Sequence, residues 1–281
     1  MNYLQVLKFG SYKLKLNKID THILDSELLL SFILKSSREQ ILTNLSSNIN
    51  ENNFEEFKKI LSRREKKEPI AYITNNKEFW KNNFYVNNHV LIPRPETELI
   101  VEEVLKNTDI NSSKSFLEVG TGSGCLIISI LKERLKCSAT AIDICKKALN
   151  IAKFNAKMHH LQNKINFVNM NIDKFIDYKY DFIISNPPYI TKQDLSRLDD
   201  DVSFYEPHLA LEAGVDGLRE IKKLILKSKH LLKTNGRLIF EIGKDQMEYS
   251  KYLLKINGFR INKVSKDLNL IPRIIVATKI F

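Results

Sequence analysis

Two short segments carry residue types and spacings that could do chemistry. The first is the loop 120–124, which reads Gly-Thr-Gly-Ser-Gly and follows the apolar run 115–119. Glycine lets the backbone turn tightly, so a ligand could lie against peptide groups at the start of the next helix. The spacing is Gly-x-Gly-x-Gly, whereas a dinucleotide-binding turn would place its third glycine one residue later, at Cys125. The loop predicts a ligand site and disfavours a nicotinamide or flavin.

An acidic residue ends the next apolar run. Asp143 follows Ala141 and Ile142, and a carboxylate at that edge of a sheet can accept hydrogen bonds from both hydroxyls of a ribose. Asp143 could also cap the helix expected from Lys146, and the two roles are compatible. Together with the glycine loop, Asp143 indicates a nucleoside ligand.

The second segment is Asn-Pro-Pro-Tyr at 186–189, directly after the apolar run 180–185. The prolines fix the backbone, so the carbonyls of Asn186 and Pro187 can face a ligand, and the Asn186 side chain adds a third acceptor. Converging acceptors suit an NH2 group with two hydrogens, while the ring of Tyr189 can lie against a flat amide or base. The alternative is a simple turn, which the position after a buried strand disfavours.

The chemistry that such a site suits is transfer to a weakly nucleophilic nitrogen. An amide or aromatic amine donates its lone pair into the attached π-system, and holding both N–H bonds can localise that pair. Opposite a methyl sulfonium, in-line transfer would gain from positioning and local electrostatics, without a strong general base.

The elements that must position these segments follow from hydrophobic periodicity. We expect helices at 97–106, 125–135, 146–158, 218–232 and 246–256. We expect strands at 115–119, 138–142, 165–170, 181–185, 236–242, 259–266 and 273–280. Alternating helices and short strands predict a parallel sheet covered on both faces, and the last two strands predict an antiparallel pair at one end.

The beginning of the chain has a different pattern. Apolar residues at helical spacing between Ile23 and Ile33, and again between Phe54 and Leu61, predict a small all-helical domain over residues 1–74. Residues 75–92 predict a linker with a β-hairpin, whose turn we expect at the adjacent asparagines 87 and 88.

Composition excludes several classes. A content of 43% hydrophobic and 27% charged residues is that of an ordinary globular protein. The three cysteines, Cys125, Cys137 and Cys145, have no spacing typical of a metal site or a disulfide framework, so we expect neither. Neither a membrane span nor a signal peptide is indicated, and we expect a cytoplasmic protein.

The net charge of +11 raises the question of a nucleic-acid partner. Residues 1–75 contain 12 Lys or Arg and 9 Asp or Glu, and the remaining residues contain 32 and 24. Because the two parts are similarly basic, no target-recognition segment stands out, and we do not expect direct nucleic-acid binding.

Further motifs extend the pattern over nearly the whole chain. They read Glu-Pro-Ile-Ala-Tyr at 68–72, Glu-Phe-Trp at 78–80, Leu-Ile-Pro-Arg-Pro-Glu-Thr-Glu at 91–98 and Tyr-Glu-Pro-His-Leu-Ala-Leu at 205–211. With the glycine loop and Asn-Pro-Pro-Tyr-Ile at 186–190, the chain resembles the bacterial release factor glutamine methyltransferases, a family of class I S-adenosylmethionine-dependent enzymes.

The resemblance implies a Rossmann-like α/β methyltransferase domain at 93–281 with a mostly parallel seven-stranded sheet, after a helical substrate-recognition domain and a hairpin linker. It implies transfer of a methyl group from S-adenosyl-L-methionine, leaving S-adenosyl-L-homocysteine, to the N5 nitrogen of the glutamine in a Gly-Gly-Gln motif of peptide chain release factors. We expect the release factor as partner, a monomer and no membrane association.

The resemblance also assigns residues. The cofactor would lie against Gly120, Thr121, Gly122, Ser123, Gly124, Asp143, Asn171, Ile172 and Asn186. The glutamine amide would be held by Asn186, Pro187, Pro188 and Tyr189, of which Asn186, Pro187 and Tyr189 would be catalytic. Two positions depart from the family: Glu118 replaces a common Asp, and Asn171-Ile172 replaces an Asp and an aromatic residue beside the adenine, with Asp173 as a competing candidate.

Two alternatives stay open. An N6-adenine methyltransferase acting on DNA or RNA faces the same electronic problem and uses a similar Asn/Asp-Pro-Pro-Tyr segment, and the net charge would favour it. A cofactor-dependent binding module without catalysis is disfavoured by the intact set of acceptors.

Overall fold

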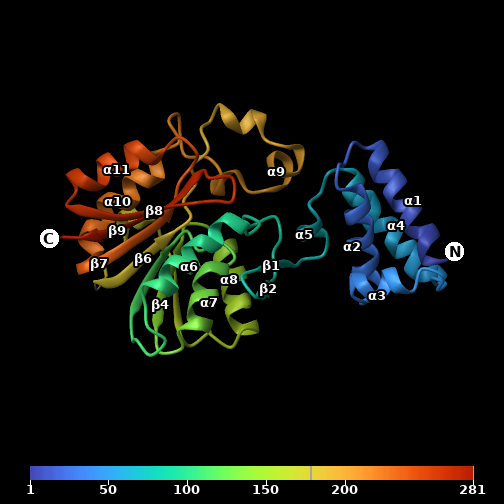
Figure 1. Cartoon of the computed structure of the whole chain (residues 1–281), viewed down its shortest axis with the longest axis horizontal. Coiled ribbons are helices and arrows are strands. Elements are labelled where there is room, and N and C mark those ends of the chain that lie inside the picture. The colour runs from blue at the N-terminus through green and yellow to red at the C-terminus, as the bar shows by residue number, and fades with distance from the viewer. Residues whose placement is uncertain (178, 281) are drawn as a thin grey trace. The chain divides into compact units, whose positions relative to one another are not determined.

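The computed structural model describes residues 1–177 and 179–280, which form two compact units. The first unit comprises Met1–Asn76 and the short segment Asp199–Tyr205. The second comprises Lys77–Leu198 and Glu206–Phe281 (Figure 1). The helical part of the sequence and the part in which strands and helices alternate therefore fold into separate compact units.

The first unit is all-helical, as predicted. Its helices are α1 (Tyr3–Leu16), α2 (His22–Leu34), α3 (Arg38–Thr43), α4 (Glu51–Glu65), α5 (Ile70–Ile73) and α9 (Asp200–Tyr205). Side chains of Asn2, Ser37 and Asn50 cap three of these helices by accepting main-chain hydrogen bonds. A Cβ on Gly10 would lie 2.4 Å from Ser26 Oγ, so glycine is what lets α1 approach α2 closely.

The linker contains a hairpin, but its turn is not where the sequence predicted it. Strand β1 (Lys77–Phe79) pairs with β2 (Asn82–Phe84) across a turn at Trp80 and Lys81. Trp80 has a φ of 50°, a conformation for which the tryptophan gives no sequence signal. Asn87 and the residue after it do form a turn, in which Asn87 Oδ1 accepts from His89 N at 3.0 Å, outside any paired strands. The predicted turn position is therefore wrong.

The second unit is built on a seven-stranded sheet with the order β5-β4-β3-β6-β7-β9-β8. Its strands are β3 (Ser115–Val119), β4 (Ser138–Asp143), β5 (Ile165–Asn169), β6 (Tyr180–Ser185), β7 (Leu232–Glu241), β8 (Phe259–Lys266) and β9 (Pro272–Lys279). The first five are parallel and β9 is antiparallel to both of its neighbours. This confirms the predicted mostly parallel sheet.

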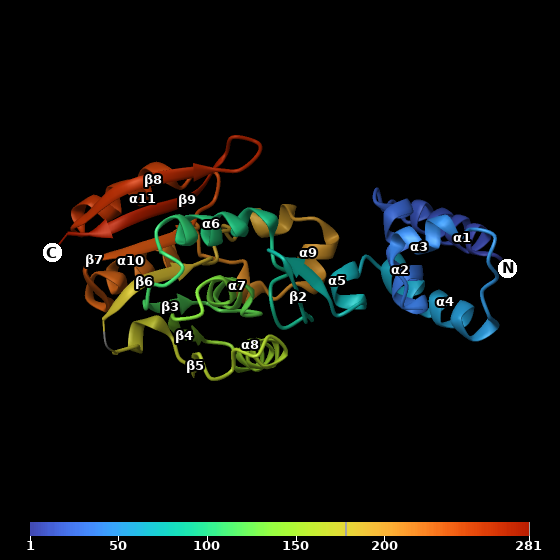
Figure 2. The ribbon, with the colours of Figure 1, turned by 60° about the horizontal axis from the view of Figure 1, so that its bottom comes forward.

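Helices cover both faces of the sheet (Figure 2). They are α6 (Glu98–Lys106), α7 (Cys125–Glu133), α8 (Lys146–Met158), α10 (Arg219–Leu231) and α11 (Met247–Ile256). One apolar cluster joins the first three to one face, and a second joins α10 and α11 to the other. Short 3-10 turns fill the connections: η1 (Pro95–Thr97), η2 (Ile172–Lys174), η3 (Asp194–Arg197) and η4 (His208–Ala210).

Most predicted elements begin and end within two residues of the observed ones. The largest deviation is β7, which begins at Leu232 and not at residue 236. Its register against β6 shifts between Tyr180 and Phe182, and the extra length carries the polar residues 233–235, which the apolar pattern did not include.

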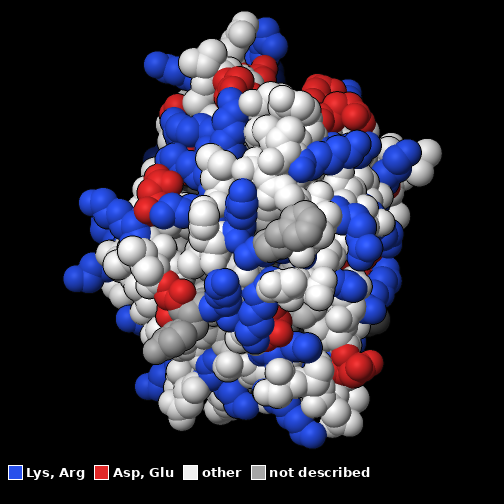
Figure 3. Space-filling view, turned by 90° about the vertical axis from the view of Figure 1, so that its left-hand side faces the viewer, with Lys and Arg blue, Asp and Glu red and all other residues white. Residues whose placement is uncertain are grey.

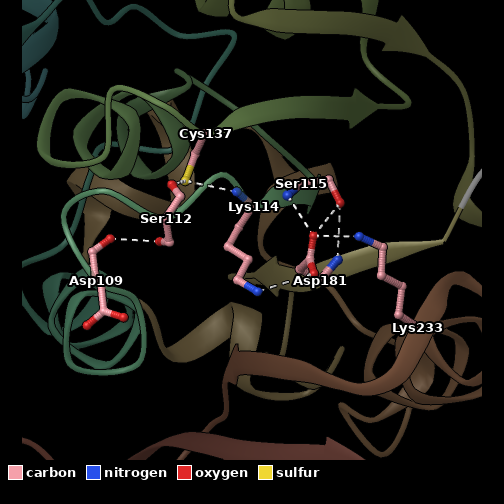
Figure 4. A network of polar contacts seen from close by, with 7 residues as sticks. All are labelled: Asp109, Ser112, Lys114, Ser115, Cys137, Asp181 and Lys233. Carbon is pink, nitrogen blue, oxygen red and sulfur yellow. Dashed lines mark hydrogen bonds and ion pairs between the residues drawn. The ribbon is translucent and has the colours of Figure 1, made fainter.

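A polar network aligns the amino ends of three strands (Figure 4). One carboxylate oxygen of Asp181 accepts from Ser115 N at 2.9 Å, from Ser115 Oγ at 2.8 Å and from Lys233 Nζ at 2.7 Å. Lys114 Nζ lies 3.8 Å from the other oxygen. Because these residues belong to the starts of β3, β6 and β7, Asp181 ties the sheet together at the edge opposite the carboxyl ends of the parallel strands.

Candidate active site

The predicted functional segments meet at the carboxyl ends of β3, β4 and β6. The chain proceeds from β3 to β4 and β5 on one side, and from β6 to β7 on the other, so the strand order reverses between β3 and β6. Ligands of open α/β sheets bind at such a reversal, outside the carboxyl ends of the strands. The glycine loop follows β3 and Asn186 follows β6, and these two strands pair directly.

The glycine loop has the backbone shape that the sequence suggested. Gly120 and Gly122 have φ values of 73° and 54°, which residues with a Cβ rarely adopt. No heavy atom lies within 4 Å of a Cβ built on either residue, so the loop faces open space there. Gly124 also has a positive φ, 78°, and packing adds a second reason for glycine there, because a Cβ would lie 3.1 Å from Ile128 and 3.2 Å from Ala152.

Asp143 ends β4 and its carboxylate holds the loop. One oxygen accepts from Gly122 N at 2.9 Å and the other accepts from Cys145 N at 2.8 Å. The N-cap residue of α8 is Cys145, so the predicted capping role of Asp143 is wrong, and its bond to Cys145 N fixes the turn before the helix. Burial raises the pKa of Asp143, although both main-chain bonds act in the opposite direction. A carboxylate has about four acceptor sites, so two remain for a ligand.

A second carboxyl group lies beneath the same loop. Glu118 in β3 is 2% exposed and accepts a hydrogen bond from the Thr121 hydroxyl. Burial raises the pKa of Glu118 to about 8, and the negative charge of Asp143 adds to that effect. At neutral pH Glu118 is therefore mostly protonated, and it supports the loop without adding a full charge beside Asp143.

The segment after β5 places the candidate adenine residues as follows. Asn171 Oδ1 accepts from Asp173 N at 2.9 Å and so caps the turn η2. Ile172 is 6% exposed and packs in the apolar cluster under α10. Asp173 is exposed, and its carboxylate lies 3.6 Å from Lys223 Nζ.

Asn186 is the central residue of the second segment. Its side-chain Nδ2 donates to Thr97 Oγ1 at 3.0 Å, which turns Oδ1 away from Thr97. In the part of the chain that the structure describes, no donor contacts Asn186 Oδ1 or the main-chain carbonyl oxygens of Asn186 and Pro187. Three acceptors are thus available next to the glycine loop, as the sequence suggested.

Tyr189 is held by the last residue of β7. Its hydroxyl donates to Glu241 Oε1 at 3.2 Å, while Thr97 Oγ1 donates to Glu241 Oε2 at 2.6 Å. Glu241 is 1% exposed. Burial raises its pKa to about 7, against the two hydrogen bonds, which lower it.

The main chain of Tyr189 is fixed by Gln246. The Gln246 Nε2 group donates to Tyr189 O and to Gly217 O, both at 2.9 Å, and Oε1 accepts from Gly243 N at 2.9 Å. A Cβ on Gly217 would lie 2.6 Å from Tyr189 O, so only glycine permits this approach. The Tyr189 ring position is therefore determined from both its hydroxyl and its backbone.

Two further side chains connect the linker to this site. Asn155 is fully buried, and its Nδ2 donates to Tyr85 O at 3.0 Å and to Ser123 O at 2.8 Å. Glu206 accepts from Ile92 N at 3.0 Å and forms an ion pair with Arg94. The linker is thus attached to the glycine loop and, through the motifs at 91–98 and 205–211, to the loop after β6.

The structure brings the glycine loop, Asp143 and the 186–189 segment to one edge of the sheet. Sequence reasoning assigns no role to Glu241, Gln246 or Asn155, and it names Thr97 only as part of the 91–98 motif, of which the family resemblance places residues 93–98 at the border of the active site. A signal existed for Glu241, since an acidic residue ends the apolar run Leu-Ile-Phe of a buried strand. No local signal marks Asn155, which lies on a helix and acts on segments 32 and 70 residues away.

The residues present fit S-adenosylmethionine. The open space at Gly120 and Gly122 leaves room along the loop, and the Asp143 carboxylate keeps acceptor capacity for hydroxyl groups. Both features suit a nucleoside that carries a small charged side chain and no phosphate groups.

Comparison with known proteins gives matches over both units. Residues 5–74 match the model of the PrmC N-terminal domain, and residues 95–199 match that of the methyltransferase small domain. The chain is 38% identical over 225 residues to the release factor glutamine methyltransferase of Clostridium acetobutylicum, covering 79% of each.

A second relative is longer. The bifunctional methyltransferase of Rickettsia typhi is 38% identical over 255 residues, which are 83% of this chain and 49% of that protein. The chain therefore spans about half the length of such bifunctional relatives. Among solved structures, a methyltransferase from Pyrococcus furiosus shares the fold with a TM-score of 0.51 at 15% identity, covering 70% of this chain and 89% of that one.

Proposed function

The chain belongs to the release factor glutamine methyltransferases and has a class I methyltransferase fold, and from this we propose that it methylates the side-chain amide nitrogen of a glutamine in a peptide chain release factor. The methyl donor would be S-adenosyl-L-methionine, and the glutamine would be that of a Gly-Gly-Gln motif. A release factor is the partner we propose.

The observation that carries the proposal is the orientation of Asn186. Its Nδ2 is bonded to Thr97, so its Oδ1 and the carbonyl oxygens of Asn186 and Pro187 remain for a ligand. A primary amide offers two N–H donors in one plane, which such acceptors can hold together. Tyr189, fixed by Glu241 and Gln246, would lie against the amide plane.

The cofactor would be held by the opposite half of the site. The loop 120–124 would line its amino-acid end, Asp143 would accept from its ribose, and Asn171 and Ile172 would border the adenine. When bound, S-adenosylmethionine supplies an electrophilic methyl group on a sulfonium.

The protein's contribution is to bring the amide nitrogen into line and to localise its lone pair. Asn186 and Pro187 would hold the two amide hydrogens, which favours the pyramidal nitrogen of the transition state over the planar amide. As the bond between nitrogen and the methyl carbon forms and the bond between that carbon and sulfur breaks, one of the two amide hydrogens would leave as a proton to solvent, and the product would be a neutral N-methyl amide. Because orientation of the reactants supplies the gain in rate, the nitrogen would not need a strong general base before the transfer.

For the first unit we propose a role in docking the release factor. Four apolar side chains at the junction of α1 and α2 are exposed by 41% to 62%: Tyr12, Leu16, Ile23 and Leu24. A bond between Ser11 Oγ and His22 Nδ1 at 2.8 Å places these helix ends side by side. Apolar residues grouped at a surface are typical of an interaction site.

Adenine methylation of nucleic acid is the alternative, and at least part of the positive charge that would favour it lies away from the candidate site. Figure 3 shows the side of the molecule on which β9 ends, where Lys and Arg outnumber Asp and Glu. By register, β9 ends beside the beginning of β7, the edge of the sheet opposite the candidate site. An enzyme acting on a polynucleotide would need its positive charge beside the reacting base.

A methyl-transfer assay tests the proposal. Purified protein and labelled cofactor are incubated separately with a release factor, with the same factor carrying Gln→Ala in its Gly-Gly-Gln motif, and with adenine-containing DNA and RNA. We expect label only in the unmodified factor, and a short Gly-Gly-Gln peptide to be a poorer substrate than the whole factor. Label in nucleic acid and none in the factor would overturn the proposal in favour of the alternative.

A further inference from the structure

Hydrogen bonds connect the side-chain amide of Asn186 to Thr97 and Thr97 to Glu241. Asn186 Nδ2 lies 3.0 Å from Thr97 Oγ1, which lies 2.6 Å from Glu241 Oε2. Thr97 is 3% exposed and Glu241 is 1% exposed, so water does not compete for these bonds. Asn186 follows β6, Thr97 ends η1 and Glu241 ends β7, and of the three the family resemblance assigns a catalytic role to Asn186 alone.

The direction of each bond follows from donor and acceptor chemistry. An ionised carboxylate only accepts, so Thr97 must give its single hydroxyl hydrogen to Glu241. The Thr97 oxygen can then only accept, and the group of Asn186 that faces it must be the Nδ2 donor. Oδ1 consequently faces the side where the substrate amide would lie.

We propose that Thr97 and Glu241 are positioning residues that fix the orientation of the Asn186 amide and thereby present its oxygen to the substrate nitrogen. The inference rests on the proposed function and deepens it. A reversed amide would direct N–H donors at the N–H donors of a glutamine, and the acceptor set that localises the lone pair would be lost.

The other contacts of Glu241 keep it in this role. Its second oxygen accepts from Tyr189, so the same carboxylate holds Tyr189 directly and Asn186 through Thr97. Around it, Arg273 of β9 favours the ionised form, while Glu96 of η1 disfavours it. Burial raises the pKa of Glu241 to about 7. Protonation below that pH would give Glu241 a hydrogen to donate to Thr97. Thr97 could then donate to Asn186 Oδ1, which would permit the reversed orientation of the Asn186 amide.

A matched pair of substitutions at Thr97 tests the proposal. Thr97→Val keeps the shape and removes the hydroxyl, whereas Thr97→Ser keeps the hydroxyl and removes a methyl group. With release factor as substrate, we expect Thr97→Val to lower kcat about tenfold, as for the loss of one oriented hydrogen bond, with KM changed less than about threefold. Thr97→Ser should recover most of kcat. Equal kcat for the valine and serine variants would overturn the proposal.

The pH profile tests the role of Glu241. We expect kcat of the wild-type protein to fall on acidification through about pH 7, where Glu241 gains its proton. Glu241→Gln should lower kcat and remove this acid limb. An acid limb that persists unchanged in Glu241→Gln would contradict the assignment.

A third measurement does not depend on turnover. In the side-chain amide region of an NMR spectrum, the Nδ2 resonance of Asn186 can be identified by its absence in Asn186→Ala. We expect a hydrogen-bonded, slowly exchanging proton in the wild type and Thr97→Ser, and a free amide in Thr97→Val. An unchanged resonance in Thr97→Val would overturn the inference. Wild-type protein that transfers no methyl group to the factor would instead overturn the proposed function, while the resonance still tests the orientation.

Discussion

The two halves of the candidate site are built over equivalent pairs of side chains. Under the glycine loop, buried Glu118 accepts from Thr121, three residues away in the sequence. Under the Asn-Pro-Pro-Tyr segment, buried Glu241 accepts from Thr97, which is 144 residues away. Burial raises both pKa values, to about 8 and about 7 respectively.

The difference lies in what each threonine does next. Thr121 belongs to the loop that it stabilises, so this pair shapes a backbone that already contains its ligand groups. Thr97 belongs to another element and accepts a hydrogen bond from Asn186 Nδ2, so that pair orients a side chain. The buried glutamate of the cofactor half thus acts within its own loop, although Asp143 and Asn155 also hold that loop, whereas the buried glutamate of the substrate half acts entirely between distant segments.

The largest effect should follow from removing the oriented side chain itself. We expect Asn186→Ala to lower kcat by on the order of a hundredfold or more, because an acceptor for the reacting nitrogen acts chiefly in the transition state. Cofactor affinity, measured by calorimetry, should change by only a few-fold. Undiminished turnover of Asn186→Ala would contradict the proposed role of Asn186. It would also leave no functional distinction between the two halves of the site.

The fold was predictable to the extent that its signals are local. Alternating apolar strands and helices gave the parallel sheet, because the central strands β3, β4 and β6 are largely buried and the pattern repeats within about 30 residues. The position of the hairpin turn was predicted wrongly because its cause is not local. Trp80 adopts a positive φ, and its main-chain N donates to Glu98 at 2.7 Å, whereas the adjacent residues carry no turn signal.

The candidate site divides in the same way. The glycine loop and the Asn-Pro-Pro-Tyr segment are contiguous, and their chemistry could be inferred from residue types alone. The supporting residues Thr97, Glu241 and Gln246 could not, because each acts on a segment at least 50 positions from it in the chain. Their roles depend on the sheet order, which places the end of β7 beside the end of β6.

An intermediate effect should come from the cofactor half. We expect Asp143→Ala to weaken cofactor binding by about 1 to 3 kcal/mol, since it removes a charged acceptor and leaves Gly122 N and Cys145 N unpaired. Asp143→Asn, which retains an acceptor for one of these groups, should lose less. Wild-type cofactor affinity of Asp143→Ala in calorimetry would refute the ribose assignment. A loss confined to kcat would mean that Asp143 acts in the same step as Asn186, and the two halves of the site would no longer be functionally distinct.

The smallest effect is a difference in how the two buried glutamates make stability depend on pH. Each carboxyl has a folded pKa above the ordinary value of a glutamate, 4.5, so the folded state keeps a proton that the unfolded chain releases, and stability falls as pH rises toward the folded pKa. For Glu241 the fall should end near pH 7, and for Glu118 near pH 8. As pH rises from 5 to 8 we therefore expect Tm of the wild type to decline, and each of Glu241→Gln and Glu118→Gln to remove part of that decline. The contribution of one group is limited to about 1.4 kcal/mol per pH unit, which thermal melts at closely spaced pH values can detect. A decline in both variants as steep as in the wild type would mean that neither glutamate titrates in this window, and the electrostatic likeness of the two halves would then have to be abandoned.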